Sequence, residues 1–133
     1  MKFVLIDHIV ERTPERIVAL KQVSFAEEYL ADHFPTFPIL PGVLMLEVMV
    51  QAARAMIGTQ GDSPLVLGEV KALKYGNMVR PGEALEVEVT LHKRNDDGSF
   101  TCKGSGRVRR SGQAVASDDV AVSGRFTLRP IRR

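Results

Sequence analysis

The chain has 133 residues, 44% of them apolar, and a net charge of +2, values typical of one compact domain spanning residues 1–133. The small net charge, 6% aromatic content and absence of a recognisable nucleic-acid-binding motif argue against a nucleic-acid partner. Because the lone Cys102 cannot form an internal disulfide and the N-terminal apolar run is too short for a signal peptide, we expect a cytoplasmic protein. The widely separated histidines and cysteine predict no metal site.

Ile17–Phe25 is the first segment whose residues favour a strand, and an unusual loop follows it. The loop carries His33 and has a proline at every third position: Pro35, Pro38 and Pro41. Each proline fixes its own φ and disfavours helix in the residue before it, so the loop should be extended and rigid. Pro41-Gly42 should then open a helix, with proline in the first turn, where its missing N–H costs nothing.

The helix expected from Val43 to Ile57 is apolar on almost every side, and its polar residues are Glu47, Gln51 and Arg54. At about 100° per residue, positions separated by four and seven residues lie on one narrow stripe. Such a helix should be central and buried, and it is too short to cross a membrane. A buried carboxylate must be hydrogen-bonded or face a polar cleft. Burial would favour the protonated form of Glu47, which suits a general acid.

The remainder of the chain reads mainly as strands. From Leu85 to His92 apolar and polar residues alternate strictly, which is typical of a half-buried strand. Turn residues at Asn95–Gly98 and Arg110–Gln113 flank a further strand. The other expected strands are Val66–Tyr75, Phe100–Arg109 and Ala114–Leu128. One buried helix followed by antiparallel strands predicts an α+β fold.

The segment from His33 to Gln51 closely resembles the signature of the β-hydroxyacyl-acyl-carrier-protein dehydratases of fatty-acid synthesis. The residues that carry the resemblance are His33-Phe34-Pro35, Pro38, Pro41-Gly42-Val43-Leu44, Glu47 and Gln51. The resemblance implies a hotdog fold, in which an antiparallel sheet wraps around one long central helix. It also matches Phe3–Asp7 to the first strand of the family and Arg80–Glu83 to a turn between two long strands. A Glu at 47 together with Pro35 favours the general dehydratase branch over the dehydratase-isomerase branch.

The chain departs from the family pattern at two positions. Asp32 and Thr36 stand on either side of the His-Phe-Pro motif, where the family usually has glycine. These residues bear on the shape of the loop and on the range of substrates more than on the type of reaction.

The resemblance implies removal of water from a 3-hydroxyacyl thioester to give the trans-2-enoyl thioester. His33 would take the C2 proton, Glu47 would protonate the departing hydroxyl, the Gly42 N–H would bind the thioester carbonyl, and Gln51 would orient Glu47. The substrate would be carried on the phosphopantetheine arm of acyl carrier protein, with no other cofactor. In the family the His and Glu of one site come from different subunits. A homodimer, or a higher multiple of dimers, is therefore implied.

Other interpretations remain open for several residues. A hotdog acyl thioesterase also uses a helix carboxylate, and a non-catalytic acyl-binding hotdog protein would need no chemistry at all. Glu47 could be a buried polar anchor for Gln51 and Arg54. Two histidines, His8 and His92, read as structural or solvated.

Two further groups of residues have a structural and a functional interpretation. Three methionines could line an acyl tunnel or pack in the core: Met45, Met49 and Met56. The arginines of the last third could form a solvated face or a basic rim that steers the acidic carrier protein. They are Arg107, Arg109, Arg110, Arg125, Arg129, Arg132 and Arg133.

Overall fold

The computed structural model describes residues 5–24, 40–58, 65–110, 112–113 and 116–131. This part of the chain contains one helix and six strands, which form a single antiparallel sheet in the order β1-β2-β4-β5-β6-β3. In chain order the elements are β1 (His8–Arg12), β2 (Arg16–Gln22), α2 (Gly42–Ile57), β3 (Leu65–Tyr75), β4 (Ala84–Arg94), β5 (Phe100–Arg109) and β6 (Val120–Pro130). The expected α+β arrangement is confirmed.

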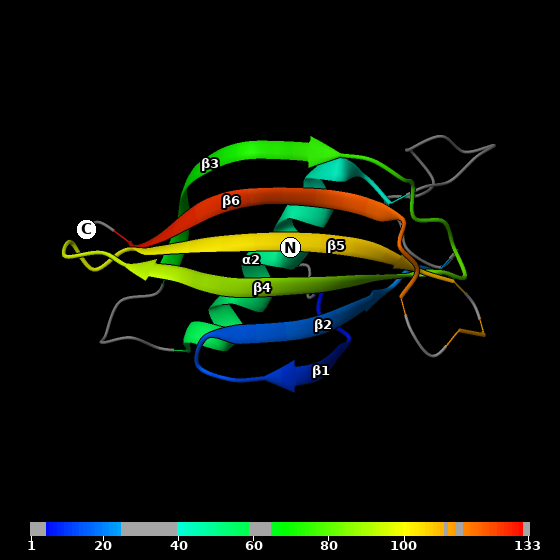
Figure 1. Ribbon diagram of the computed structural model, residues 1–133, viewed down its shortest axis with the longest axis horizontal. Coiled ribbons are helices and arrows are strands. Elements are labelled where there is room, and N and C mark those ends of the chain that lie inside the picture. The colour runs from blue at the N-terminus through cyan, green and yellow to red at the C-terminus, as the bar shows by residue number, and fades with distance from the viewer. Residues whose placement is uncertain (1–4, 25–39, 59–64, 111, 114–115, 132–133) are drawn as a thin grey trace.

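The helix α2 crosses one face of the sheet and lies behind the strands in the view of Figure 1. Every second residue of β5 is buried, from Phe100 to Val108, because alternate side chains of a strand point to opposite faces. On α2 the buried side chains include Val48, Met49 and Val50. The helix approaches β5 closely, since a Cβ on Gly104 would lie only 2.7 Å from the Met49 sulfur. One layer of sheet over one helix therefore encloses the core.

The methionines of α2 belong to this core. Met45, Met49 and Met56 are all buried and form part of the same hydrophobic cluster as the inward side chains of the sheet. Ordinary core packing therefore accounts for them in the described chain. No helix among the described residues is long and apolar enough to cross a membrane.

Two expected strand positions are wrong. Of the expected strand Phe3–Asp7, the described residues 5–7 lie in no strand, although Leu5 is buried. The first strand of the described chain is His8–Arg12, and all five of its side chains are exposed. The last strand begins at Val120 rather than Ala114. Before it, the Ser117 hydroxyl donates to the Val108 carbonyl at 2.7 Å and accepts from the Asp119 N–H at 3.2 Å. These bonds close a turn, and the strand begins only after it.

The start of α2 also differs in detail from the expectation. The helix begins at Gly42, and Pro41 is its N-cap residue with φ −60° and ψ 141°. Proline therefore lies just outside the helix and not in its first turn, although its fixed φ suits both positions.

Candidate active site

The polar stripe of α2 is a connected group in which Glu47 receives two contacts. The amide Nε2 of Gln51 donates to Oε1 of Glu47 at 3.3 Å. Nη1 of Arg54 lies 3.7 Å from the same carboxylate oxygen. Among the described residues, the second carboxylate oxygen, Oε2, has no hydrogen-bond partner. One oxygen of Glu47 is thus held by the helix, and the other is available to a molecule outside it.

The orientation of Gln51 is fixed from its other side. The backbone N–H of Leu5 donates to Oε1 of Gln51 at 2.8 Å. Because a backbone N–H can only donate, the oxygen of the amide must face Leu5, and the NH2 group must face Glu47. A residue 46 positions earlier in the chain therefore determines which group Gln51 presents to the carboxylate.

Arg54 is anchored in a similar way. Its Nε donates to the backbone carbonyl of Leu65 at 3.0 Å, where β3 begins. Sequence reasoning placed Glu47, Gln51 and Arg54 on one stripe but missed Leu5 and Leu65. Both act through main-chain atoms, which leave no signal in residue type.

The N-terminus of α2 presents unpaired backbone donors. The Pro41 carbonyl accepts from the N–H groups of Leu44 at 3.0 Å and Met45 at 3.2 Å. No side chain caps the helix, and among the described residues the N–H groups of Gly42 and Val43 have no acceptor. These donors coincide with the positive end of the helix dipole, so this point suits an oxygen that gains negative charge.

Tyr75, at the end of β3, is a third residue that sequence reasoning missed here. Two carbons of its ring would lie 3.0 Å from a Cβ added at Gly42. The ring therefore packs against the first residue of the helix, and partial burial raises the pKa of its hydroxyl group. No pattern in the sequence brings the end of a strand against the start of a helix 33 residues earlier.

The expected burial of Glu47 is not observed in the single chain. Its side chain is 38% exposed, because α2 buries only the face that meets the sheet, and Val43 on the open side is 72% exposed. The expectation that Glu47 is buried is therefore wrong for one chain alone. His33, like Asp32 and Thr36, lies outside the described residues.

The other groups considered as sites have structural surroundings. Cys102 is buried in the core, and desolvation raises the pKa of its thiol to about 11. Within the described ranges no three His, Cys, Asp or Glu side chains gather as metal ligands. Of the C-terminal arginines, three pair with carboxylates: Arg107 with Asp118, Arg109 with Glu86, and Arg110 with Asp119. Because these three are paired, they fit a solvated face better than a basic rim for the carrier protein.

Comparison with protein families matches residues 10–117 to the ApeI-like family, described as ApeI dehydratase. Among curated proteins, the 3-hydroxyacyl-[acyl-carrier-protein] dehydratase FabZ of Pseudothermotoga lettingae is 38% identical over 91 residues, covering 68% of this chain and 65% of that protein. The FabZ of Anaeromyxobacter sp. is 37% identical over 122 residues, covering 86% and 76%. That of Lactobacillus helveticus is 35% identical over 128 residues, covering 92% and 79%. The chain thus spans from just under two thirds to about four fifths of these relatives.

Solved structures share the architecture. The dehydratase heterocomplex ApeI:P from Xenorhabdus doucetiae superposes with a TM-score of 0.72 at 18% identity, over 98% of this chain and 84% of that one. The virulence protein Cj0977 from Campylobacter jejuni gives a TM-score of 0.67 at 12% identity, over 97% and 86%. At such low identity these structures bear on the fold, and they confirm the hotdog architecture. With the match over residues 10–117 and relatives above 30% identity, the chain belongs to the ApeI-like dehydratase family.

Proposed function

We propose that this protein is a 3-hydroxyacyl-[acyl-carrier-protein] dehydratase, a hydro-lyase of fatty-acid or related lipid biosynthesis. The observation that carries the proposal is Glu47, a carboxylate with one oxygen held by Gln51. Within the described residues its other oxygen has no partner, nor have the first N–H groups of the same helix. Relatives of 35 to 38% identity bear the name of that activity. The substrate in this proposal is a thioester on acyl carrier protein.

The proposed reaction is an elimination in which one residue of the site takes a proton from the substrate and another supplies one. His33 takes the proton from C2 of the 3-hydroxyacyl group, and the electron pair released forms the C2–C3 double bond. The C3–O bond breaks, and Glu47 supplies the proton that turns the leaving hydroxide into water. The thioester oxygen gains negative charge in the transition state, and the Gly42 N–H at the helix N-terminus stabilises it. Gln51 acts by orienting the Glu47 carboxyl group.

We also propose that the working form is a homodimer in which two subunits complete each site. Glu47 is on the open side of α2, and exposed apolar side chains lie close to the helix N-terminus: Val43 is 72%, Tyr75 50% and Met78 51% exposed. Exposed apolar surface of this kind favours a covering partner, and a second subunit would also desolvate Glu47. Light scattering at micromolar concentration should give the mass of a dimer or a multiple of it. A monodisperse, active monomer would contradict the shared site.

The activity is tested by the reverse reaction, hydration of a short trans-2-enoyl thioester. Loss of the conjugated-enoyl absorbance without release of free thiol supports the dehydratase. Release of thiol would indicate a thioesterase, and the absence of both reactions would favour an acyl-binding protein.

His33→Ala should lower the hydration rate at least about a hundredfold, the usual contribution of one acid–base group. His92→Ala is the matched control, because His92 lies exposed on β4. Near-normal turnover of the His33→Ala protein would remove His33 from the mechanism.

A further inference from the structure

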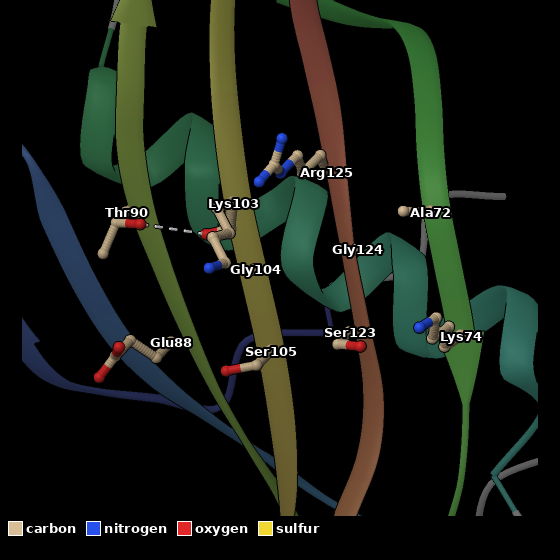
Figure 2. A pocket seen from close by; sticks show the side chains of 10 residues that line it. All are labelled: Ala72, Lys74, Glu88, Thr90, Lys103, Gly104, Ser105, Ser123, Gly124 and Arg125. Atoms are coloured by element: carbon tan, nitrogen blue, oxygen red, sulfur yellow. Dashed lines mark hydrogen bonds between the residues drawn. The ribbon is translucent and has the colours of Figure 1, made fainter.

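The face of the sheet that points away from α2 carries a groove of about 380 Å³ over β3, β4, β5 and β6. Figure 2 looks onto this groove, with the helix passing behind the strands. Three cationic and three hydroxyl side chains line it: Lys74, Lys103, Arg125, Thr90, Ser105 and Ser123. The groove is therefore polar and positively charged, and it lies on the opposite side of the sheet from Glu47.

Three cations form one row across neighbouring strands. Lys103 on β5 is directly opposite Arg125 on β6, and Arg125 is directly opposite Lys71 on β3. Like charges in directly opposed positions destabilise a sheet. Lys71 is paired with Glu69 at 3.5 Å, so the repulsion that remains unneutralised is the one between Lys103 and Arg125.

The described part of the chain supplies no ion-pair partner for the cations that line the groove. The carboxylate that lines the groove, Glu88, is paired with Arg16 at 2.6 Å. Among the described residues Lys74, Lys103 and Arg125 have no ion-pair partner. Their charges are thus available to a ligand.

A backbone irregularity adds the fourth cation to this face. Lys71 is opposite Arg125 and Lys74 is opposite Ser123, so three steps along β3 match two steps along β6. In a regular strand Lys71 and Lys74 would point to opposite faces. The extra residue at Ala72, whose φ is +53°, brings both to the outer face, as Lys74 in Figure 2 shows. Bulges often serve to redirect a side chain at a functional site.

The neighbouring strand accommodates the bulge. A Cβ added at Gly124 would lie 3.3 Å from the Cα of Leu73, which is tighter than an ordinary contact. Glycine at 124 therefore gives β3 room to bulge inward at Leu73. A positive φ is uncommon for a residue other than glycine, and such conformations persist where the surrounding structure holds them.

We propose that this groove binds a phosphate group of an anionic ligand. Lys74, Lys103 and Arg125 would neutralise its charge, and the hydroxyl groups of Ser105 and Ser123 would donate hydrogen bonds to its oxygens. Lys103 and Arg125 are directly opposed, and such side chains have Cβ atoms about 5 Å apart, so both can reach one phosphate group. Lys74 is opposite Ser123, two residues along β6 from Arg125. The ligand is either a free phosphate ester or a lipid headgroup. The site is independent of the proposed reaction.

Binding is measured by calorimetry with inorganic pyrophosphate at constant ionic strength. We expect saturable binding to the wild type, and binding at least about tenfold weaker in Lys103→Gln and Arg125→Gln, since each loses a charged hydrogen-bond donor. Lys93→Gln is the matched control: it removes the same charge from an exposed position of β4 outside the groove. Sedimentation with phosphatidylglycerol vesicles, compared with phosphatidylcholine vesicles, distinguishes a lipid headgroup from a soluble phosphate ester as the ligand.

Thermal unfolding gives an independent readout. Without ligand, Arg125→Gln should raise the melting temperature by about 1 to 3 °C, because the repulsion with Lys103 is removed. Pyrophosphate should raise the melting temperature of the wild type more than that of the variant at the same concentration. The proposal is overturned if neither pyrophosphate nor the anionic vesicles bind, or if Lys93→Gln weakens binding equally. Binding of poly-L-glutamate alone would also overturn it and would indicate an acidic protein surface.

Discussion

The charged side chains on the two faces of the sheet differ in whether other side chains hold them. On the helix side, Glu47 is held by Gln51 at 3.3 Å and by Arg54 at 3.7 Å. On the outer side, Lys103 and Arg125 are directly opposite each other on neighbouring strands, and neither has an ion-pair partner among the described residues. The first arrangement orients one group before any ligand arrives. The second arrangement places two positive charges side by side, and an anionic ligand would reduce their repulsion.

The comparison shows that charge alone does not identify a site. Glu47 is set up by its neighbours, and those neighbours are themselves anchored to the main chain of Leu5 and Leu65. The prediction for the helix side is therefore that the loss of function becomes smaller as the contact removed lies farther from the reacting atoms. Substitutions at three positions test this order.

The largest effect should come from Glu47→Gln. The amide keeps the shape and the ability to accept from Gln51, but it cannot deliver a proton. Turnover should fall at least about a hundredfold, with little change in the binding of an acyl thioester, because the lost interaction belongs to the transition state. Steady-state kinetics and thermal unfolding measure this together. A variant that unfolds easily yet turns over normally while folded would instead make Glu47 a structural anchor.

An intermediate effect is expected at Gln51, where two bonds can be separated. Gln51→Glu keeps an acceptor for the Leu5 N–H but loses the donor to Glu47 and places a second carboxylate beside it. Its turnover should fall about tenfold, as expected for a misoriented catalytic group, and its pH–rate profile should shift. Gln51→Leu removes both bonds and should also lower the melting temperature, since the Leu5 N–H is left without its acceptor.

The Gln51 prediction distinguishes a positioning role from a structural one. A positioning residue changes kcat and the pH profile with KM nearly constant. If Gln51→Glu kept the wild-type pH profile and lost only thermal stability, the role of Gln51 would be structural, limited to its hydrogen bond with Leu5.

The sequence made some of these features predictable and concealed others. The helix over 43–57 and its polar stripe follow from spacing, because position along a helix determines which face a residue occupies. The bonds from Leu5 to Gln51 and from Arg54 to Leu65 join backbone atoms to distant side chains, and no spacing rule predicts them. The exposure of Glu47 was predicted wrongly because an apolar helix suggests burial on all sides, and part of that surface is open in one chain.

The strands show the same limit. β4 and β5 alternate cleanly and were predicted nearly to the residue. β1 has only exposed side chains and forms through its pairing with β2, so it has no alternation to find. The bulge in β3 has alanine, not glycine, at its positive φ. Its position depends on the room left by Gly124 on the next strand, which is a property of the folded sheet.

The smallest effect should come from Arg54→Gln. The guanidinium lies 3.7 Å from Glu47, and both side chains are substantially exposed at 40% and 38%. Exposed ion pairs contribute about 0.2 to 1 kcal/mol, which corresponds to less than about a fivefold change in rate. The effect should shrink further with added salt, because solvent-accessible charges are screened, and the wild type and variant should converge near 1 M ionic strength. A loss as large as that of Glu47→Gln, unchanged by salt, would mean that Arg54 contacts the substrate itself. It would then belong to the reaction and not to the support of Glu47.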